Sequence, residues 1–294
     1  MAMNNVLIAS DFSKHANYAL QRAISLAEQH KSILNFLHIL KQPWIGSFAQ
    51  LPINELQQNY FSVKKKTERK LLTLLKKYSH AIETHVSVLP GRAADEIVRF
   101  AKENQCELIV AGAHGHYYIN NYVLGTTSGA IIEQSHIPIL LVKKEPVFAY
   151  DRILIATDFS EVSKEAVEFT FNCFPEASFQ LLHILDIFGR KILDTGDQDE
   201  NSIGSENHPT KDIIETLDDF LKKCNVDNKK FQKKIIGGYF ADSIITESEK
   251  WRANLISFGT QGNSRLHYLL MGSVAKRILH LSTTDMLAVP AKQH

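Results

Sequence analysis

The sequence predicts an α/β protein built from two copies of one domain. Its 294 residues repeat at an offset of 147, half the length of the chain. Within each half, short apolar runs alternate with stretches of helical periodicity, which is typical of a mostly parallel sheet covered by helices. The length also suits two domains of ordinary size. We therefore predict one domain at residues 1–146 and a second at residues 147–294.

Three separated blocks carry the repeat. Both halves open with a strand-like segment that leads into Asp-Phe-Ser, at residues 7–13 and 154–160. Each half later contains the pattern Gly-x2-Gly-x9-Gly-[Ser/Thr], formed by Gly112, Gly115, Gly125 and Thr126 and again by Gly259, Gly262, Gly272 and Ser273. A Gly-x3-Asp block links 91–95 with 238–242. Three blocks in one register are hard to obtain by chance, so each half has its own candidate site.

Each element of the first half has a local signal. Apolar runs predict strands at 6–10, 33–40, 84–89, 108–111 and 139–142. Ser13 is a candidate N-cap for a helix with one apolar face, formed by Ala16, Ala19, Leu20, Ala23, Ile24 and Ala27. Further helices are expected at 51–78, with lysines on its outer face, at 93–103 and at 127–134.

The second half repeats this order. Strands are expected at 152–157, 179–186, 231–236, 255–258 and 286–289, and helices at 160–174, 212–224, 240–250 and 273–281. The join at 143–150 is short, and Pro146 disfavours helix there. The halves differ most at 194–211, a polar and acidic segment. We expect a solvated loop there, and the alternative is a lid over the second site.

The composition excludes several classes of function. Lys and Arg number 33 and Asp and Glu 32, so no overall field attracts nucleic acid or an anionic membrane. The apolar runs are far shorter than the ~20 residues that span a bilayer, and the N-terminus lacks the features of a signal peptide. Cys106, Cys173 and Cys224 are scattered and fit a reducing compartment. We expect a cytoplasmic protein that binds neither nucleic acid nor membrane.

The glycine pattern has the chemistry of an anion site. A strand that ends in Gly-x-x-Gly places backbone N–H groups at the carboxyl edge of a parallel sheet, where open α/β sheets bind ligands. The missing β-carbons let phosphate oxygens approach the main chain. The later Gly-[Ser/Thr] is expected to open a helix, whose first N–H groups and dipole favour an anion. Asp11 and Asp158 follow the first strand of each half, where a carboxylate can accept from a ribose hydroxyl or an adenine amino group.

Each of these motifs also has an ordinary explanation when it stands alone. A Gly-x-x-Gly is usually a turn, and Asp11 could simply cap the following helix together with Ser13. Their joint occurrence, twice and in one register, favours a binding site over these explanations.

Both halves resemble the universal stress protein family, and the chain looks like a tandem member of it. The resemblance covers essentially all 294 residues and rests on the Asp-Phe-Ser openings, the glycine motifs and the terminal strands. It implies two tandem Rossmann-like domains of the adenine nucleotide alpha hydrolase-like kind, each a five-stranded parallel sheet flanked by helices. In that family the glycine motif marks ATP-binding members, so the resemblance implies ATP as the ligand, with Mg²⁺ as an accompanying ion.

The resemblance also implies how the halves associate. Family members commonly pair through the last strand, so the chain would form an intramolecular pseudo-dimer with 139–142 beside 286–289. A further homodimer stays open.

Position by position, the resemblance implies two sets of ligand-binding residues. The first set is Ala9, Asp11, Ala111, Gly112, His114, Gly115, Gly125, Thr126 and Thr127. The second set is Ala156, Asp158, Phe258, Gly259, Gln261, Gly262, Gly272, Ser273 and Val274. The aspartates would hold the adenosine, the residues at the end of the fourth strand would line the base and ribose, and the later glycines and hydroxyls would cradle the phosphates.

The halves depart from the family pattern in different ways. Arg or His is common between the first two glycines, which His114 fits and Gln261 does not. The loss of a potential positive charge at Gln261 weakens the attraction for phosphate in the second site. Conversely, Val274 matches the usual helix opening, whereas Thr127 stands where Val is usual. Neither site matches fully, so one of the two could be degenerate.

Other features have competing interpretations. His114-x-His116 suggests a metal only weakly without a third ligand, and a role for His114 at the phosphates or at the surface is favoured. His38 and His183 both precede Ile-Leu at the end of a second strand; the resemblance puts them near adenine, and packing explains them equally well. The basic tract of Lys64, Lys65, Lys66, Arg69 and Lys70 is expected to be a solvated helix face, with a partner-binding patch as the alternative.

The leading hypothesis is an ATP-binding stress-response regulator that acts through an unidentified protein partner. The sequence lacks the Gly-Lys-[Ser/Thr] of a P-loop, and no catalytic set can be assigned. We therefore predict no catalytic residue. One alternative is a slow ATPase or phosphotransferase, including autophosphorylation at Thr126 or Ser273. The other is a scaffold, or a binder of another small molecule, in which the motif is only a turn.

Overall fold

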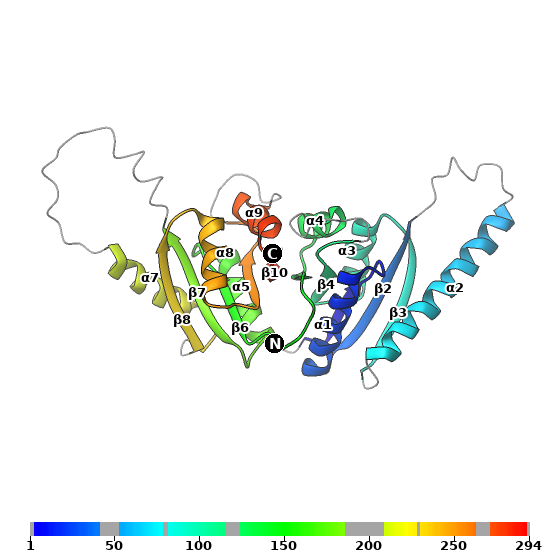
Figure 1. Cartoon of the computed structure of the whole chain (residues 1–294), viewed down its shortest axis with the longest axis horizontal. Coiled ribbons are helices and arrows are strands. Elements are labelled where there is room, and N and C mark those ends of the chain that lie inside the picture. The colour runs from blue at the N-terminus through cyan, green and yellow to red at the C-terminus, as the bar shows by residue number, and fades with distance from the viewer. Residues whose placement is uncertain are drawn as a thin grey trace, which may run out of the picture. The chain divides into compact units, whose positions relative to one another are not determined.

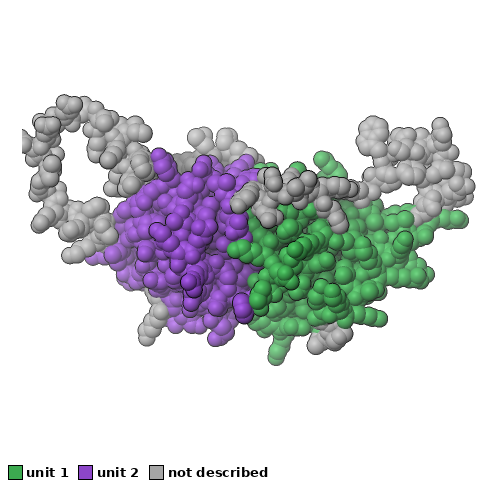
Figure 2. Space-filling view, in the orientation of Figure 1, with its two compact units in different colours: residues 1–147 green, residues 148–294 purple. Residues whose placement is uncertain are grey.

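The computed structural model describes residues 3–41, 53–78, 82–115, 124–185, 209–227, 230–262 and 271–292. The chain divides into two compact units, Met1–Val147 and Phe148–His294 (Figure 2). Each unit is a parallel sheet flanked by helices, so the predicted fold class is confirmed.

The first unit contains, in its described part, a parallel sheet of five strands (Figure 1). The strands are β1 (Asn5–Ala9), β2 (Ile33–Lys41), β3 (Thr84–Gly91), β4 (Leu108–Gly112) and β5 (Ile139–Val142), and the helices are α1 (Lys14–His30), α2 (Ile53–Tyr78), α3 (Ala93–Glu103) and α4 (Thr126–Gln134). The strand order is β3-β2-β1-β4-β5, and every neighbouring pair is parallel. The inner strands are continuous apolar runs because both of their faces are buried.

Helix α1 fixes the geometry of the turn that follows β1. The hydroxyl of Ser13 accepts a hydrogen bond from the Ala16 N–H at 3.1 Å, which confirms Ser13 as the N-cap. The predicted apolar face is buried and packs on β1, β4 and β5. The helix ends at His30, and the left-handed backbone of the next residue, Lys31 (φ 56°), closes the last turn. The turn between β1 and α1 is therefore fixed at both of its ends, by the strand on one side and by the capped helix on the other.

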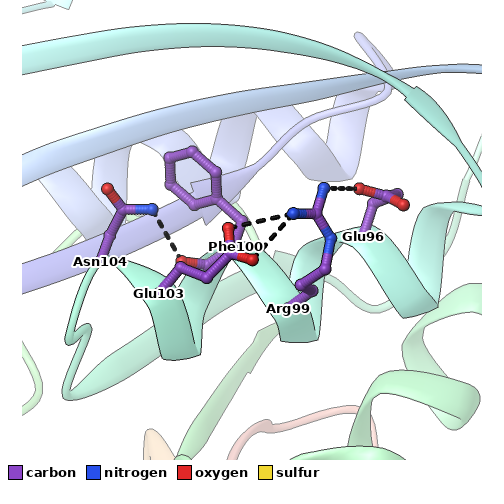
Figure 3. Close-up of polar contacts among 5 residues, drawn as sticks. All are labelled: Glu96, Arg99, Phe100, Glu103 and Asn104. Atoms are coloured by element: carbon purple, nitrogen blue, oxygen red, sulfur yellow. Dashed lines mark hydrogen bonds and ion pairs between the residues drawn. The ribbon is translucent and has the colours of Figure 1, made fainter.

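Helix α3 has an ionic outer face and an apolar inner face. The Arg99 guanidinium donates to both oxygens of Glu103, at 2.8 and 3.0 Å, and also to Glu96 (Figure 3). These pairs lie at the surface, where ion pairs contribute little to stability. The buried Ile97 and Phe100 are on the inner side, and α3 packs on β2 and α4. This packing places the first turn of α3 beside the carboxyl edge of the sheet.

The second unit repeats the architecture. Its described strands are β6 (Arg152–Ala156), β7 (Ser178–Leu185), β8 (Phe231–Gly237), β9 (Leu255–Gly259) and β10 (Asp285–Val289), and its described helices are α5 (Glu161–Cys173), α7 (Pro209–Lys223), α8 (Phe240–Lys250) and α9 (Ser273–Leu281). The strand order is β8-β7-β6-β9-β10, again all parallel. Ser160 caps α5 as Ser13 caps α1, by accepting from the Ser163 N–H at 3.2 Å.

One expected boundary is wrong. The segment 194–211 was expected to be a loop throughout, but α7 begins at Pro209. Proline is favoured at the first position of a helix because its missing N–H is not needed there and its φ is already helical. The rest of that segment, and with it the lid interpretation, lies outside the described residues.

The cysteines are core residues. Cys106, Cys173 and Cys224 are all buried free thiols. Burial raises the pKa of Cys106 and of Cys224 to about 12, and it raises the pKa of Cys173 further. Across the described ranges, no helix is both long and apolar enough to cross a membrane.

Candidate functional site

A cavity of about 500 Å³ opens at the carboxyl edge of the first unit's sheet. It lies where β1 and β4 end, which is the point where the strand order switches direction. The sequence predicted nine residues for this site, and all of them line the cavity: Ala9, Asp11, Ala111, Gly112, His114, Gly115, Gly125, Thr126 and Thr127. The fold thus gathers segments that are up to 118 positions apart in the chain (from Ala9 to Thr127).

The second unit has the equivalent cavity, with a volume of about 310 Å³. Its lining also includes all nine predicted residues: Ala156, Asp158, Phe258, Gly259, Gln261, Gly262, Gly272, Ser273 and Val274. Each cavity is lined by residues of its own unit.

The Asp-Phe-Ser turn holds a carboxylate at the mouth of each cavity. Phe12 has φ 65°, a left-handed conformation that is rare for a bulky residue. Its N–H donates to Ser10 Oγ at 3.1 Å, and the Ser13 N–H donates to Asp11 Oδ1 at 2.9 Å. Asp11 is therefore not the cap of α1, because Ser13 has that role. One of its oxygens closes the turn, and the carboxylate is exposed at the cavity.

The second unit forms the same turn. Phe159 has φ 64°, and its N–H donates to Thr157 Oγ1 at 3.0 Å. Asp158 Oδ1 accepts from the Ser160 N–H at 3.1 Å and from the Ser160 hydroxyl at 2.5 Å. A strained backbone costs roughly 1–3 kcal/mol, so its occurrence at both openings indicates that the position of the aspartate is under constraint.

Aromatic packing offsets the strain of this turn. The Phe12 ring lies 4.6 Å from the His38 ring, and Lys70 Nζ lies 3.7 Å from the Phe12 ring centroid. In the second unit, Phe159 stacks on His183 at 4.3 Å and meets Phe220 at 5.6 Å. Lys70 thus has a specific contact, whereas Lys65, Lys66 and Arg69 form the exposed face that was expected for the basic tract.

The second glycine of each motif makes room for this carboxylate. A β-carbon built on Gly115 would lie 2.8 Å from Asp11 Oδ2, and one on Gly262 would lie 2.7 Å from Asp158 Oδ2. Both distances are shorter than any real contact of a β-carbon. The backbone of the second glycine and the carboxylate of the first turn therefore lie in contact at the lining of the cavity in both units.

The first and third glycines position the loop itself. A β-carbon on Gly112 would lie 2.8 Å from the His15 carbonyl carbon, so only glycine lets β4 end so close to α1. The Gly125 N–H donates to the Ala113 carbonyl at 2.9 Å, and α4 begins at the next residue. The Gly272 N–H donates to Thr260 in the same way, at 2.9 Å. The expectation that Gly-[Ser/Thr] opens a helix is thus confirmed in both units, and the first-turn N–H groups have no partner within the helix.

His38 and His183 line the two cavities in the same orientation. His38 Nδ1 lies 2.7 Å from the Ser10 carbonyl oxygen, and His183 Nδ1 lies 2.9 Å from that of Thr157. A carbonyl can only accept, so Nδ1 carries the hydrogen, and in the neutral ring Nε2 is an acceptor. Burial lowers the pKa of His38, against the opposing effect of its hydrogen bond to Ser10. The neutral form of His38 is therefore favoured at neutral pH.

His114 is not a surface residue. Its side chain is 4% exposed, lines the first cavity and packs edge-on against His15 with ring centroids 5.0 Å apart. Its predicted role at the phosphates stays a prediction. His116 lies outside the described residues, and within those residues no group of three His, Cys, Asp or Glu side chains could hold a metal ion.

Sequence reasoning missed one wall of each cavity. Ala93 and Ile97 of α3 line the first cavity, and Phe240 and Ile244 of α8 line the second. Their signal was present in the Gly-x3-Asp block, which contains Ala93 and Phe240, but nothing in that block indicates a ligand. The packing of α3 on β2 and α4 brings this wall to the site.

Comparison with known proteins identifies the family. The model of the universal stress protein family matches residues 3–143 and 149–290. The chain belongs to the universal stress protein family. The two matches make it a tandem member, as the repeat predicted.

Individual relatives agree with this assignment. The chain is 22% identical over 311 residues to the universal stress protein E homolog of Haemophilus influenzae, an alignment that covers 100% of this chain and 99% of the relative. It is 26% identical over 141 residues to a universal stress protein of Methanocaldococcus jannaschii, which covers 47% of this chain and 81% of the relative. The solved structure of a universal stress protein from Archaeoglobus fulgidus has a TM-score of 0.67 at 16% identity, with 99% of both chains covered. At that identity the similarity supports the fold.

Proposed function

We propose that each unit binds an adenine nucleotide in its cavity, that ATP is the principal ligand, and that the chain acts as a regulator through a partner protein. One observation carries the proposal. In both units an exposed aspartate carboxylate lies against a glycine loop at the rim of a cavity at the strand switch, and the N-terminus of a helix opens beside them.

The chemistry of each part suits a different part of the nucleotide. The carboxylates of Asp11 and Asp158 are acceptors for ribose hydroxyls or an adenine amino group. The N–H groups and hydroxyls at the start of α4 and α9 suit phosphate oxygens. A Mg²⁺ ion would be held mainly by the phosphates, which is usual for this cation in nucleotide sites.

The first test is a calorimetric titration of the purified chain with ATP. We expect Gly115→Ala to weaken nucleotide binding in the first unit by roughly tenfold or more, because the added methyl displaces the Asp11 carboxylate and narrows the cavity. Since the displaced atom is the end of an exposed side chain, the fold should persist.

A matched control distinguishes this effect from a general effect of removing a glycine. A β-carbon on Gly129, within α4, would meet only Leu124 Cδ2 at an ordinary 3.5 Å. Gly129→Ala should therefore bind nucleotide like the wild type. Absence of binding of ATP, ADP and AMP to the wild-type chain would reject the proposal in favour of a scaffold or another ligand.

A further inference from the structure

The two cavities differ in size because of identifiable side chains. The first has about 500 Å³ and the second about 310 Å³. Ala93, the first residue of α3, corresponds to Phe240, the first residue of α8. Ala111, on β4, corresponds to Phe258 on β9. Both phenylalanines line the second cavity, so two rings stand where the first cavity has methyl groups.

The polar groups around the helix opening change in the same direction. Thr127 of α4 corresponds to Val274 of α9, so the helix opening of the second cavity lacks this hydroxyl. The Ser128 hydroxyl, which Ala275 lacks, donates to the Gly112 carbonyl at 2.9 Å and so makes no difference to a ligand. Gln261 replaces His114 and cannot carry a positive charge. In the first cavity, Thr127 and His114 are the groups that would face a chain of phosphates.

Some changes in the opposite direction add hydroxyl groups to the second cavity, but they compensate only in part for these losses. Ser163 lines the second cavity where the first has Ala16, but its hydroxyl bonds at 3.0 Å to that of Thr157, which corresponds to Ser10. The Ser163 hydroxyl also lies 2.9 Å from the Ser160 carbonyl, to which it can donate. The second such change, Thr260 in place of Ala113, adds a buried hydroxyl.

An ion pair ties the narrowed wall to the helix opening. Arg277 of α9 donates to Asp242 of α8 at 3.0 Å. In the first unit, Asp95 instead pairs with Arg92 of its own turn at 3.8 Å, and Ala130 occupies the position of Arg277. Phe240 therefore belongs to a helix end that is linked to α9. Its side chain is 41% exposed, which places the ring at the mouth of the cavity.

We propose that the two sites select adenine nucleotides of different length. The first site accepts the triphosphate, and the second accepts the monophosphate but excludes the triphosphate, with Phe240 as the side chain that limits its size. This inference rests on the proposed nucleotide binding. A triphosphate has more volume and more negative charge than a monophosphate, and the second cavity has less volume and an uncharged glutamine in place of His114.

Calorimetry on the wild-type chain tests the selection directly. We expect AMP to saturate at two per chain and ATP at one per chain. ATP should then displace only one of two bound AMP molecules. Saturation with two ATP molecules of similar affinity would overturn the proposal.

Exchange of the two wall residues tests the role of Phe240. Phe240→Ala should admit a second ATP, with its affinity at that site raised roughly tenfold or more, and Ala93→Phe should weaken ATP in the first site by a similar factor. Gly115→Ala and Gly262→Ala serve as backgrounds in which one site is impaired. Tyr239→Ala is the control, because it removes a neighbouring exposed ring that is not part of the cavity lining.

The possible outcomes distinguish the length selection from the proposed nucleotide binding on which it rests. If the ratio of the affinities for AMP and ATP were the same at both sites, or if Phe240→Ala bound only one ATP per chain, the length selection would be rejected and nucleotide binding would stand. Failure of every adenine nucleotide to bind would reject both.

Discussion

At the scale of single residues, the Asp-Phe-Ser turn shows how a strained backbone serves a site. Phe12 and Phe159 hold φ values of 65° and 64°, which phenylalanine rarely adopts. The left-handed residue reverses the chain so that Asp11 reaches the Ser13 N–H and its carboxylate faces Gly115. In both units the phenylalanine ring packs on a histidine of the adjacent strand, which stabilises this turn.

The lowered pKa of His38 predicts a pH dependence of stability. Burial disfavours the charged ring, so the folded chain binds this proton less readily than the unfolded chain, whose histidine has a pKa of about 6.5. The contribution of His38 is therefore complete above that pH and is lost as the pH falls below it. His38→Asn, which keeps a donor for the Ser10 carbonyl, should show a weaker loss of stability below pH 6.5 in urea titrations.

Nuclear magnetic resonance gives an independent measurement of the same effect. The His38 resonance should titrate below about 6.5, the ordinary pKa of histidine. A His38 pKa above 6.5 would contradict the neutral assignment.

At the scale of elements, the helix caps connect the fold to the site. Ser160 accepts from the Ser163 N–H to begin α5, and its hydroxyl donates to Asp158 at 2.5 Å. One side chain thus ends the turn, starts the helix and orients the carboxylate.

Removal of this cap should be measurable. Ser160→Ala should lower the free energy of unfolding by about 1 kcal/mol, because the first turn of α5 loses its side-chain acceptor. It should also weaken ligand binding in the second unit, since Asp158 loses a donor. Glu249→Ala, at an exposed position of α8, should change stability by less than about 0.5 kcal/mol. Equal stability of the two variants would show that the cap is dispensable.

Most elements could be predicted from the sequence because their signals are local. Local patterns were sufficient for α1, α3 and α8, with a cap as a further signal for α1, and continuous apolar runs were sufficient for the buried strands. The start of α7 was missed because a proline within a polar segment resembles a loop, although the same residue is favoured at the first position of a helix.

The residues that line the cavities could be predicted only in part, because local signals do not show how distant elements pack together. The eighteen predicted residues belong to repeated motifs, so their proximity followed from strand order. The α3 and α8 walls depend on how helices pack over the sheet, which no local pattern encodes. The unusual φ of Phe12 and the burial of His114 depend in the same way on contacts with distant parts of the chain.

At the scale of the whole molecule, the buried thiols predict chemical inertness. Cys106 and Cys224, with pKa values of about 12, and Cys173 are protonated at pH 8 and shielded from solvent. The native chain should react slowly with a disulfide reagent, and all three thiols should react at once in denaturant. Rapid modification of the native chain would mean that one of these core regions opens readily.

Among the described residues, the lining of each cavity comes from one half of the chain, and this has a consequence for how the protein can change over generations. In an assembly of two identical subunits, every substitution alters both sites together, so the two sites cannot acquire different ligand preferences. In this chain the two halves are encoded separately. A codon for alanine at position 93 and one for phenylalanine at position 240 can therefore coexist, and one pocket can change in sequence while the other stays the same.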